Sequence, residues 1–170
     1  MNRPSLNEYD PYFQRYLNVV PEGEFAVLFE ESTAKVVQFF ERIPIEKHDY
    51  AYASGKWSVK AVLMHMIDTE RVFAYRALVT SRGDSATQLQ PFDEDAYAAA
   101  VNVSGRTMES LMEEFLAVRR STSLLFEHMT DAQSALLGKG PTHAISARAL
   151  GFILIGHVQH HFGVIQERYL

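Results

Sequence analysis

Residues 146–169 have the sequence SARALGFILIGHVQHHFGVIQERY. Its apolar residues recur at the spacing of one helical face, which predicts a long helix from about Ser146 to Tyr169. On a helical wheel His157 and His161 lie on this apolar face, one turn apart. The opposite face carries polar side chains: Arg148, Gln159 and Gln166.

Three further segments have the length and the apolar periodicity of helices: 21–42, 58–79 and 107–129. Pro44 ends the first, Ser58 is a plausible N-cap of the second, and residues 81–84 stop the second. Four long helices without a convincing strand predict an all-α four-helix bundle.

The remaining segments connect or cover this bundle. We expect residues 1–20 to form an N-terminal arm or short helix, and residues 130–145 to form a loop. The connection over 80–104 is unusually long, with a short helix over 93–100, and such connections often line a functional site. It can also return the chain along the bundle, so the topology stays open. We expect residues 1–170 to form a single domain.

The composition is that of an ordinary globular protein, with 47% hydrophobic and 22% charged residues among 170. A net charge of −5 argues against a nucleic-acid-binding protein, which needs a basic surface to neutralise phosphates. Because there is no cysteine, nitrogen and oxygen atoms must supply any metal ligands. The sequence contains neither an N-terminal signal core nor an apolar run long enough to span a membrane, so we expect a cytoplasmic protein.

A third histidine, His65, lies on the face of its predicted helix that also carries Ala61, Val62, Thr69, Val72 and Phe73. Lys60, Glu70 and Arg71 lie away from this face, and Arg119 is expected to face water on the third helix. Three inward-facing imidazoles could form a three-coordinate metal site with open positions. The alternative is that each is a core histidine with its own hydrogen-bond partner.

Other polar residues near these histidines have two interpretations each. His160 could support the site or lie at a helix interface, while His48, His128 and His143 are expected at the surface. Asp68 could orient an imidazole, act as a fourth ligand or form a surface ion pair. Arg76 and Arg168 each follow a site histidine by eleven residues. In a parallel helix pair both could bind an anionic substrate group, whereas otherwise they extend into solvent at the helix ends.

Two stretches resemble a known family: GKWSVKAVLMHMIDTERVFAYRAL at 55–78, followed by Arg-Gly-Asp, and GHVQHHFGVI at 156–165. They are similar to the DinB-like (YfiT-type) superfamily, and the resemblance extends from Tyr12 to Tyr169. It implies a four-helix bundle, often dimeric, that binds a divalent metal through His65, His157 and His161. Characterised members include transferases and isomerases that use bacillithiol, mycothiol or glutathione.

These observations favour a metal-dependent enzyme in which a divalent metal activates a low-molecular-weight thiol or water for attack on a small electrophile. Zinc or nickel is the expected metal, with iron and manganese as further candidates. The alternative is a non-catalytic bundle that binds a metal or a small ligand. We also expect a homodimer, because the second helix has an additional apolar stripe opposite His65: Leu63, Ile67, Ala74 and Leu78. The alternative is that the aromatic N-terminal arm covers this stripe.

Overall fold

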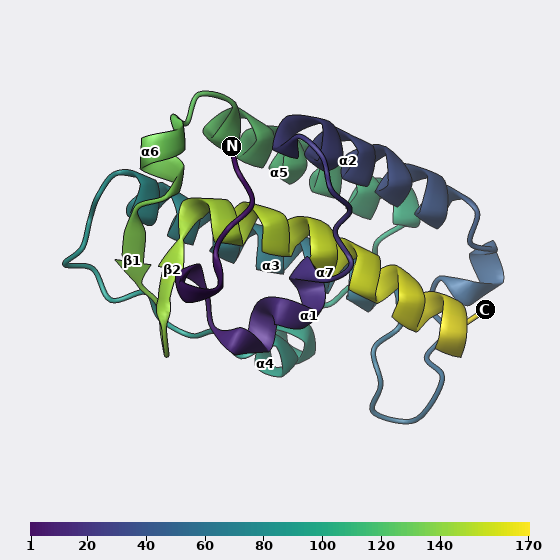
Figure 1. Cartoon of the computed structure of the whole chain (residues 1–170). Coiled ribbons are helices and arrows are strands. Elements are labelled where there is room, and N and C mark those ends of the chain that lie inside the picture. The colour runs from purple at the N-terminus through teal and green to yellow at the C-terminus, as the bar shows by residue number, and fades with distance from the viewer.

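The computed structural model describes all 170 residues, and four long helices form its bundle (Figure 1). They are α2 (Phe25–Glu41), α3 (Val59–Ser81), α5 (Met108–Glu127) and α7 (Ala147–Arg168). The predicted all-α four-helix bundle is therefore confirmed, with boundaries close to those expected. None of these helices is both long enough and apolar enough to cross a bilayer.

Side-chain caps and a glycine define the ends of these helices. Ser58, Thr107 and Ser146 each accept a hydrogen bond from the backbone N–H three residues later, which satisfies a donor that the first helical turn leaves free. After α3, Gly83 adopts a φ of +74°, a left-handed conformation that ends helices and favours glycine.

Helix α3 packs against both α7 and α5, and α2 packs against the same two helices. The α3 side chains Leu63 and Ile67 are completely buried in one apolar cluster together with Leu111 and Phe115 of α5. Half of the second apolar stripe is thus covered within the chain, whereas Ala74 is partly buried and Leu78 is 41% exposed. Leu63 and Ile67 no longer support a dimer interface, and the homodimer stays a prediction.

Helices α3 and α7 run antiparallel. The hydroxyl of Tyr169, just after α7, donates a hydrogen bond of 2.8 Å to the carbonyl of Trp57, just before α3. One apolar cluster contains α3 up to Ile67 and α7 from Val158 onward, whereas the other contains the later part of α3 and the earlier part of α7. The site histidines therefore lie where the two clusters meet.

The region 130–145 is more ordered than the loop that we expected. It contains the short helix α6 (Asp131–Ser134) and a hairpin of β1 (Leu137–Lys139) and β2 (Ala144–Ser146), which pair antiparallel. Each strand has three residues, too few for the alternating pattern that identifies a strand in a sequence. The expectation of no strand was therefore wrong, although the hairpin is only an addition to the bundle.

The N-terminal arm packs along α7 and the hairpin, as Figure 1 shows. It consists of the 3-10 helices Leu6–Glu8 and Pro11–Phe13 and the short helix α1 (Gln14–Leu17). Glu8 ties the arm to the start of α7 by accepting hydrogen bonds from Ser146 Oγ and from the Arg148 guanidinium. The long connection after α3 includes the predicted short helix, α4 (Glu94–Ala100), which packs against α3.

Candidate metal site

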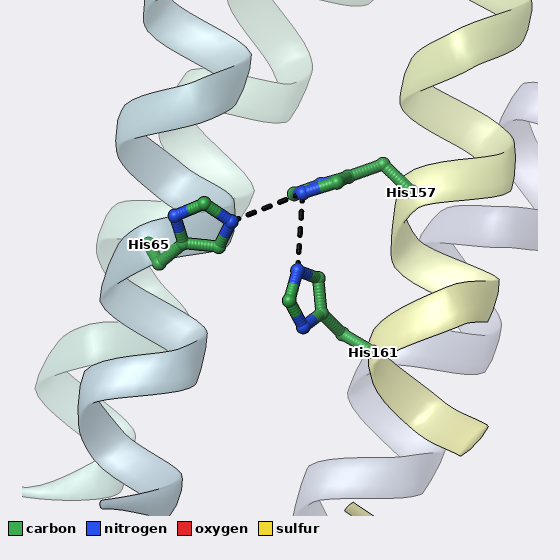
Figure 2. A group of neighbouring side chains, drawn as sticks. All are labelled: His65, His157 and His161. Atoms are coloured by element: carbon green, nitrogen blue, oxygen red, sulfur yellow. Dashed lines mark hydrogen bonds between the residues drawn. The ribbon is translucent and has the colours of Figure 1, made fainter. Parts of the chain in front are cut away.

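Three imidazoles meet between α3 and α7, as Figure 2 shows. His65 comes from the middle of α3, and His157 and His161 come from successive turns of α7. The Nε2 atom of His157 lies 3.0 Å from Nε2 of His65 and 3.0 Å from Nε2 of His161. The structure thus brings together the three histidines that the helical wheel selected.

These imidazoles are held neutral by their surroundings. His157 and His161 are buried, and His65 is partly buried. Burial lowers the pKa of His65 from 6.5 to about 4 and the pKa of His161 to about 3, because it penalises the charged form. The pKa of His157 is lowered in the same direction, first by burial and then by the neighbouring imidazoles. At neutral pH each ring therefore has a nitrogen lone pair.

The three nitrogens cannot satisfy one another by hydrogen bonding. A neutral imidazole nitrogen carries either one proton or one lone pair, so it takes part in one good hydrogen bond. His157 Nε2 has two such neighbours at 3.0 Å, and one of these contacts is left without a bond. Nδ1 of His161 is also buried without a hydrogen-bond partner, but it lies on the other edge of the ring, so a group bound at the Nε2 atoms does not compensate it. Buried polar atoms without partners cost free energy, so another group is expected to compensate the Nε2 atoms.

A divalent cation fits this arrangement. The three ligand atoms lie within 4.8 Å of one another, and no carboxylate shares the cluster. A tetrahedral zinc with Zn–N bonds of about 2.0–2.1 Å holds its ligand nitrogens roughly 3.3 Å apart, close to the separations found here. With three protein ligands, such a site keeps at least one coordination position open.

A cavity of about 550 Å³ opens onto the three histidines. The N-terminal arm, α3, the segment 91–94, the hairpin and α7 all contribute to its lining. Pro91, Phe92 and Glu94 belong to the long connection, so this segment lines the pocket as expected. A pocket of this size suits a small organic molecule.

The arm places an aromatic wall beside the histidines. The ring centroid of Tyr16 lies 5.5 Å from that of His157 and 5.5 Å from that of His160. On the other side the indole of Trp57 lies 4.7 Å from the His65 ring. Aromatic residues are frequent in the sequence of this arm, but no pattern there indicates that they would line the site.

The other polar residues that the sequence suggested for the site lie in different places. His160 lines the cavity but is exposed and lies outside the three-histidine cluster. Asp68 faces Arg71 at 3.6 Å and no imidazole, which favours the ion-pair interpretation. Arg76 lines the cavity, whereas Arg168 is exposed and donates a hydrogen bond to the Tyr52 hydroxyl. Because α3 and α7 are antiparallel, these two arginines lie at opposite ends of the helix pair.

Among the histidines expected at the surface, His128 is exposed and His48 is partly buried. The Nε2 atom of His48 lies 3.1 Å from the carbonyl oxygen of Ile43. His143 is also exposed, yet it lines the cavity, and its Nδ1 lies 2.7 Å from Oδ2 of Asp10. This pair joins the arm to the hairpin across 133 residues. No sequence pattern connects two positions so far apart, so sequence analysis could not have found it.

Comparisons with known proteins agree with this architecture. A search of curated proteins found no match. Among solved structures, the chain is similar to YfiT from Bacillus subtilis, described as a probable metal-dependent hydrolase with an unusual four-helix bundle topology. The two share 19% sequence identity at a TM-score of 0.72, over 98% of this chain and 90% of that one, which shows the fold. A family model of the DinB superfamily matches residues 28–165, and the chain therefore belongs to the DinB superfamily.

Proposed function

We propose that this protein is a metal-dependent enzyme that acts on a small molecule, with a divalent metal bound by His65, His157 and His161. The observation that carries the proposal is the meeting of three neutral imidazole nitrogens that cannot satisfy one another. A cation accepts all three lone pairs at once and removes the cost of burying them.

Zinc or nickel is the metal that we propose, with iron and manganese as the next candidates. Imidazole is a good ligand for zinc, nickel and iron, and the absence of cysteine leaves no thiolate to select a softer ion. The bound metal would act as a Lewis acid that lowers the pKa of a coordinated water or thiol.

The protein residues would bind and orient the substrate and limit its contact with water. Tyr16 and Trp57 flank the histidines on two sides, and the apolar rings of Phe73 and Phe92 line the same cavity. The opening of this cavity onto the histidines favours an enzyme over a bundle that only stores a metal. In a purely structural site, the protein would usually supply a fourth ligand and leave no pocket.

Two reactions are compatible with this site: hydrolysis, and transfer of a low-molecular-weight thiol to an electrophile. The structural likeness to YfiT, a probable metal-dependent hydrolase, supports the first, and the family resemblance seen in the sequence supports the second. Both need the same open coordination position, and they differ only in whether water or a thiol is the nucleophile.

The experiment begins with elemental analysis of untagged protein, followed by reconstitution of metal-free protein with zinc, nickel, manganese and iron. Each form is assayed for hydrolysis of activated esters and amides, and for loss of bacillithiol, mycothiol or glutathione in the presence of an activated electrophile. We expect turnover with at least one metal and none with the metal-free protein or with His157→Ala. Metal binding without turnover in any combination would favour the non-catalytic bundle, and lack of metal binding would refute the proposal.

A further inference from the structure

Arg76 is a buried cation in the cavity wall. Its side chain is 6% exposed and makes one hydrogen bond to the protein, to the carbonyl of Gln90. It forms no salt bridge, and burial is the cause that lowers the pKa of its guanidinium. The guanidinium carbon lies 5.2 Å from the ring centroid of Phe73 and 5.9 Å from that of Phe92. A guanidinium has five N–H donors, so most of them lack a protein acceptor.

The other buried guanidinium of this protein is compensated differently. Arg119 is 2% exposed, and its Nη2 lies 2.7 Å from a carboxylate oxygen of Glu70. Burying a charge is costly unless an opposite charge or several hydrogen bonds compensate it. Nε and Nη1 of Arg119 also lack hydrogen-bond partners, but its charge is paired with Glu70. Arg76 lines the cavity and has no paired charge.

The cavity floor on α3 connects Arg76 to the histidines. His65, Thr69, Phe73 and Arg76 are spaced by four, four and three residues, so they share one helical face, and all four line the cavity. At 1.5 Å per residue, the eleven residues from His65 to Arg76 correspond to a rise of about 16 Å. The site is therefore elongated, with the imidazoles toward one end and the guanidinium toward the other.

Along this floor, the polar side chains of His65 and Thr69 come first, then the apolar ring of Phe73, and then Arg76. Three buried hydroxyl groups have no hydrogen-bond partner, those of Ser32, Thr69 and Thr80, and of these only Thr69 lines the cavity. Beyond Thr69, the Phe73 ring provides an apolar surface before Arg76. The order matches an extended molecule that has a polar group near its reactive end, an apolar stem and a charged end.

We propose that Arg76 binds an anionic group, a carboxylate or a phosphate, at the end of the substrate remote from the three histidines. The planar fork of N–H donors matches both of these groups, and the aromatic rings beside it exclude water. The proposal rests on the proposed function for the identity of the substrate, but anion binding at Arg76 does not itself require a metal. The substrate class would then be an extended monoanionic or dianionic small molecule that fits a cavity of about 550 Å³.

Anion binding is tested first on the metal-free protein, so that the result is independent of metal chemistry. Butyrate, n-butyl phosphate and uncharged n-butanol are titrated into the protein and into Arg76→Met, at neutral pH and low salt. Binding is followed by calorimetry and by the NMR signals of the arginine side chains. We expect saturable binding of at least one anion, about 10-fold or more weaker in Arg76→Met, and no comparable binding of n-butanol.

Two further variants control this experiment. Arg168→Met removes an exposed arginine at the opposite end of the helix pair and should leave anion binding unchanged. Arg76→Lys retains the charge without the fork and should bind with intermediate affinity, which keeps the test valid if Arg76→Met is unstable. The proposal would be overturned if the unmodified protein, Arg76→Lys and Arg76→Met bound both anions with equal affinity. It would also be overturned if the unmodified protein bound neither anion. The preferred anion distinguishes a carboxylate from a phosphate substrate.

A second measurement connects this site to the histidines. Cobalt-loaded protein is titrated with ω-mercaptocarboxylates of increasing length and with the matching mercaptoalcohols, and thiolate coordination is followed by its absorption. We expect the carboxylates to bind more tightly once the chain is long enough, and Arg76→Met to remove this advantage. Failure to load cobalt would count against the proposed function and leave the first measurement to decide anion binding. If the protein binds cobalt but no mercaptocarboxylate of any chain length binds more tightly than the matching mercaptoalcohol, the proposal that one substrate reaches from the histidines to Arg76 is overturned.

Discussion

The backbone of Tyr16 packs directly against Gly156: a Cβ at position 156 would lie 2.0 Å from the Tyr16 carbonyl oxygen. Only a residue without a side chain allows this contact. The contact holds the N-terminal arm on α7 one residue before His157, and the Tyr16 ring then covers the histidines. The position of the cavity wall therefore depends on a glycine that ligates nothing.

Gly156→Ala should destabilise the protein by about 1–3 kcal/mol or more, because the new methyl group must displace backbone of the arm. The matched control is Gly163→Ala in the same helix, where a Cβ has no neighbouring atom within 4 Å. That substitution should stabilise the protein by roughly 0.5–1 kcal/mol, since alanine loses less backbone entropy in a helix. Urea denaturation of the two variants measures both effects, and similar changes in the free energy of unfolding would contradict the packing described here.

The buried pair of Glu70 and Arg119 should matter for stability. Arg119→Met removes one partner and leaves a buried carboxylate without its partner, which should cost about 3–5 kcal/mol. Replacing both with apolar residues, as in Glu70→Leu with Arg119→Met, should recover much of this loss. Arg120→Met, at an exposed neighbouring position, should change stability by less than about 0.5 kcal/mol. A double variant no more stable than Arg119→Met alone would refute this description of the pair.

Glu8 should make stability depend on pH under acidic conditions. Burial alone would raise the pKa of Glu8, but hydrogen bonds from Arg148, Ser5 and Ser146 outweigh it and lower the pKa from 4.5 to about 2. The lowered pKa adds stability that is fully present above pH 4.5 and is lost as the pH falls toward 2. Glu8→Gln should be less stable at pH 7 and should have a flatter pH dependence over this range. Thermal denaturation from pH 2 to 7 would show it, and parallel curves for the two proteins would contradict it.

Much of the fold could be predicted because helix periodicity and helix ends are determined by residues close together in the sequence. The apolar periodicity and the stop signals gave four helices and the short helix at 94–100, each close to its observed limits. The face of α3 opposite His65 was visible as a second apolar stripe, but the sequence could not say what covers it. The structure covers Leu63 and Ile67 with α5.

The errors concern features that depend on distant partners. The helical wheel placed Glu70 away from the His65 face, and Arg119 was expected to face water, since charged residues rarely lie inside a protein without compensation. Their compensation is each other, across two helices far apart in the sequence. The three-residue strands of the hairpin were likewise too short to carry a pattern, and their pairing is stabilised by tertiary contacts such as the hydrogen bond from Leu89 N–H to the Lys139 carbonyl.

The histidine cluster was predictable because two of its members share one helical face and the third lies on the apolar face of another helix. What the sequence lacked was the direction of the helices. The suggestion that Arg76 and Arg168 reach one end of the cavity required parallel helices, and the antiparallel packing of α3 and α7 separates them. Of these two arginines, only Arg76 lines the cavity.

Zinc titration of the metal-free protein and of four single variants shows directly which histidines bind the metal. His65→Ala, His157→Ala and His161→Ala should each lose most of the zinc affinity, because each removes one of three ligands. His160→Ala, which removes an exposed neighbouring imidazole, should still bind one zinc per chain, with at most about a 10-fold to 100-fold weaker affinity. If His160→Ala lost the zinc while His161→Ala kept it, the three histidines would not be the metal site.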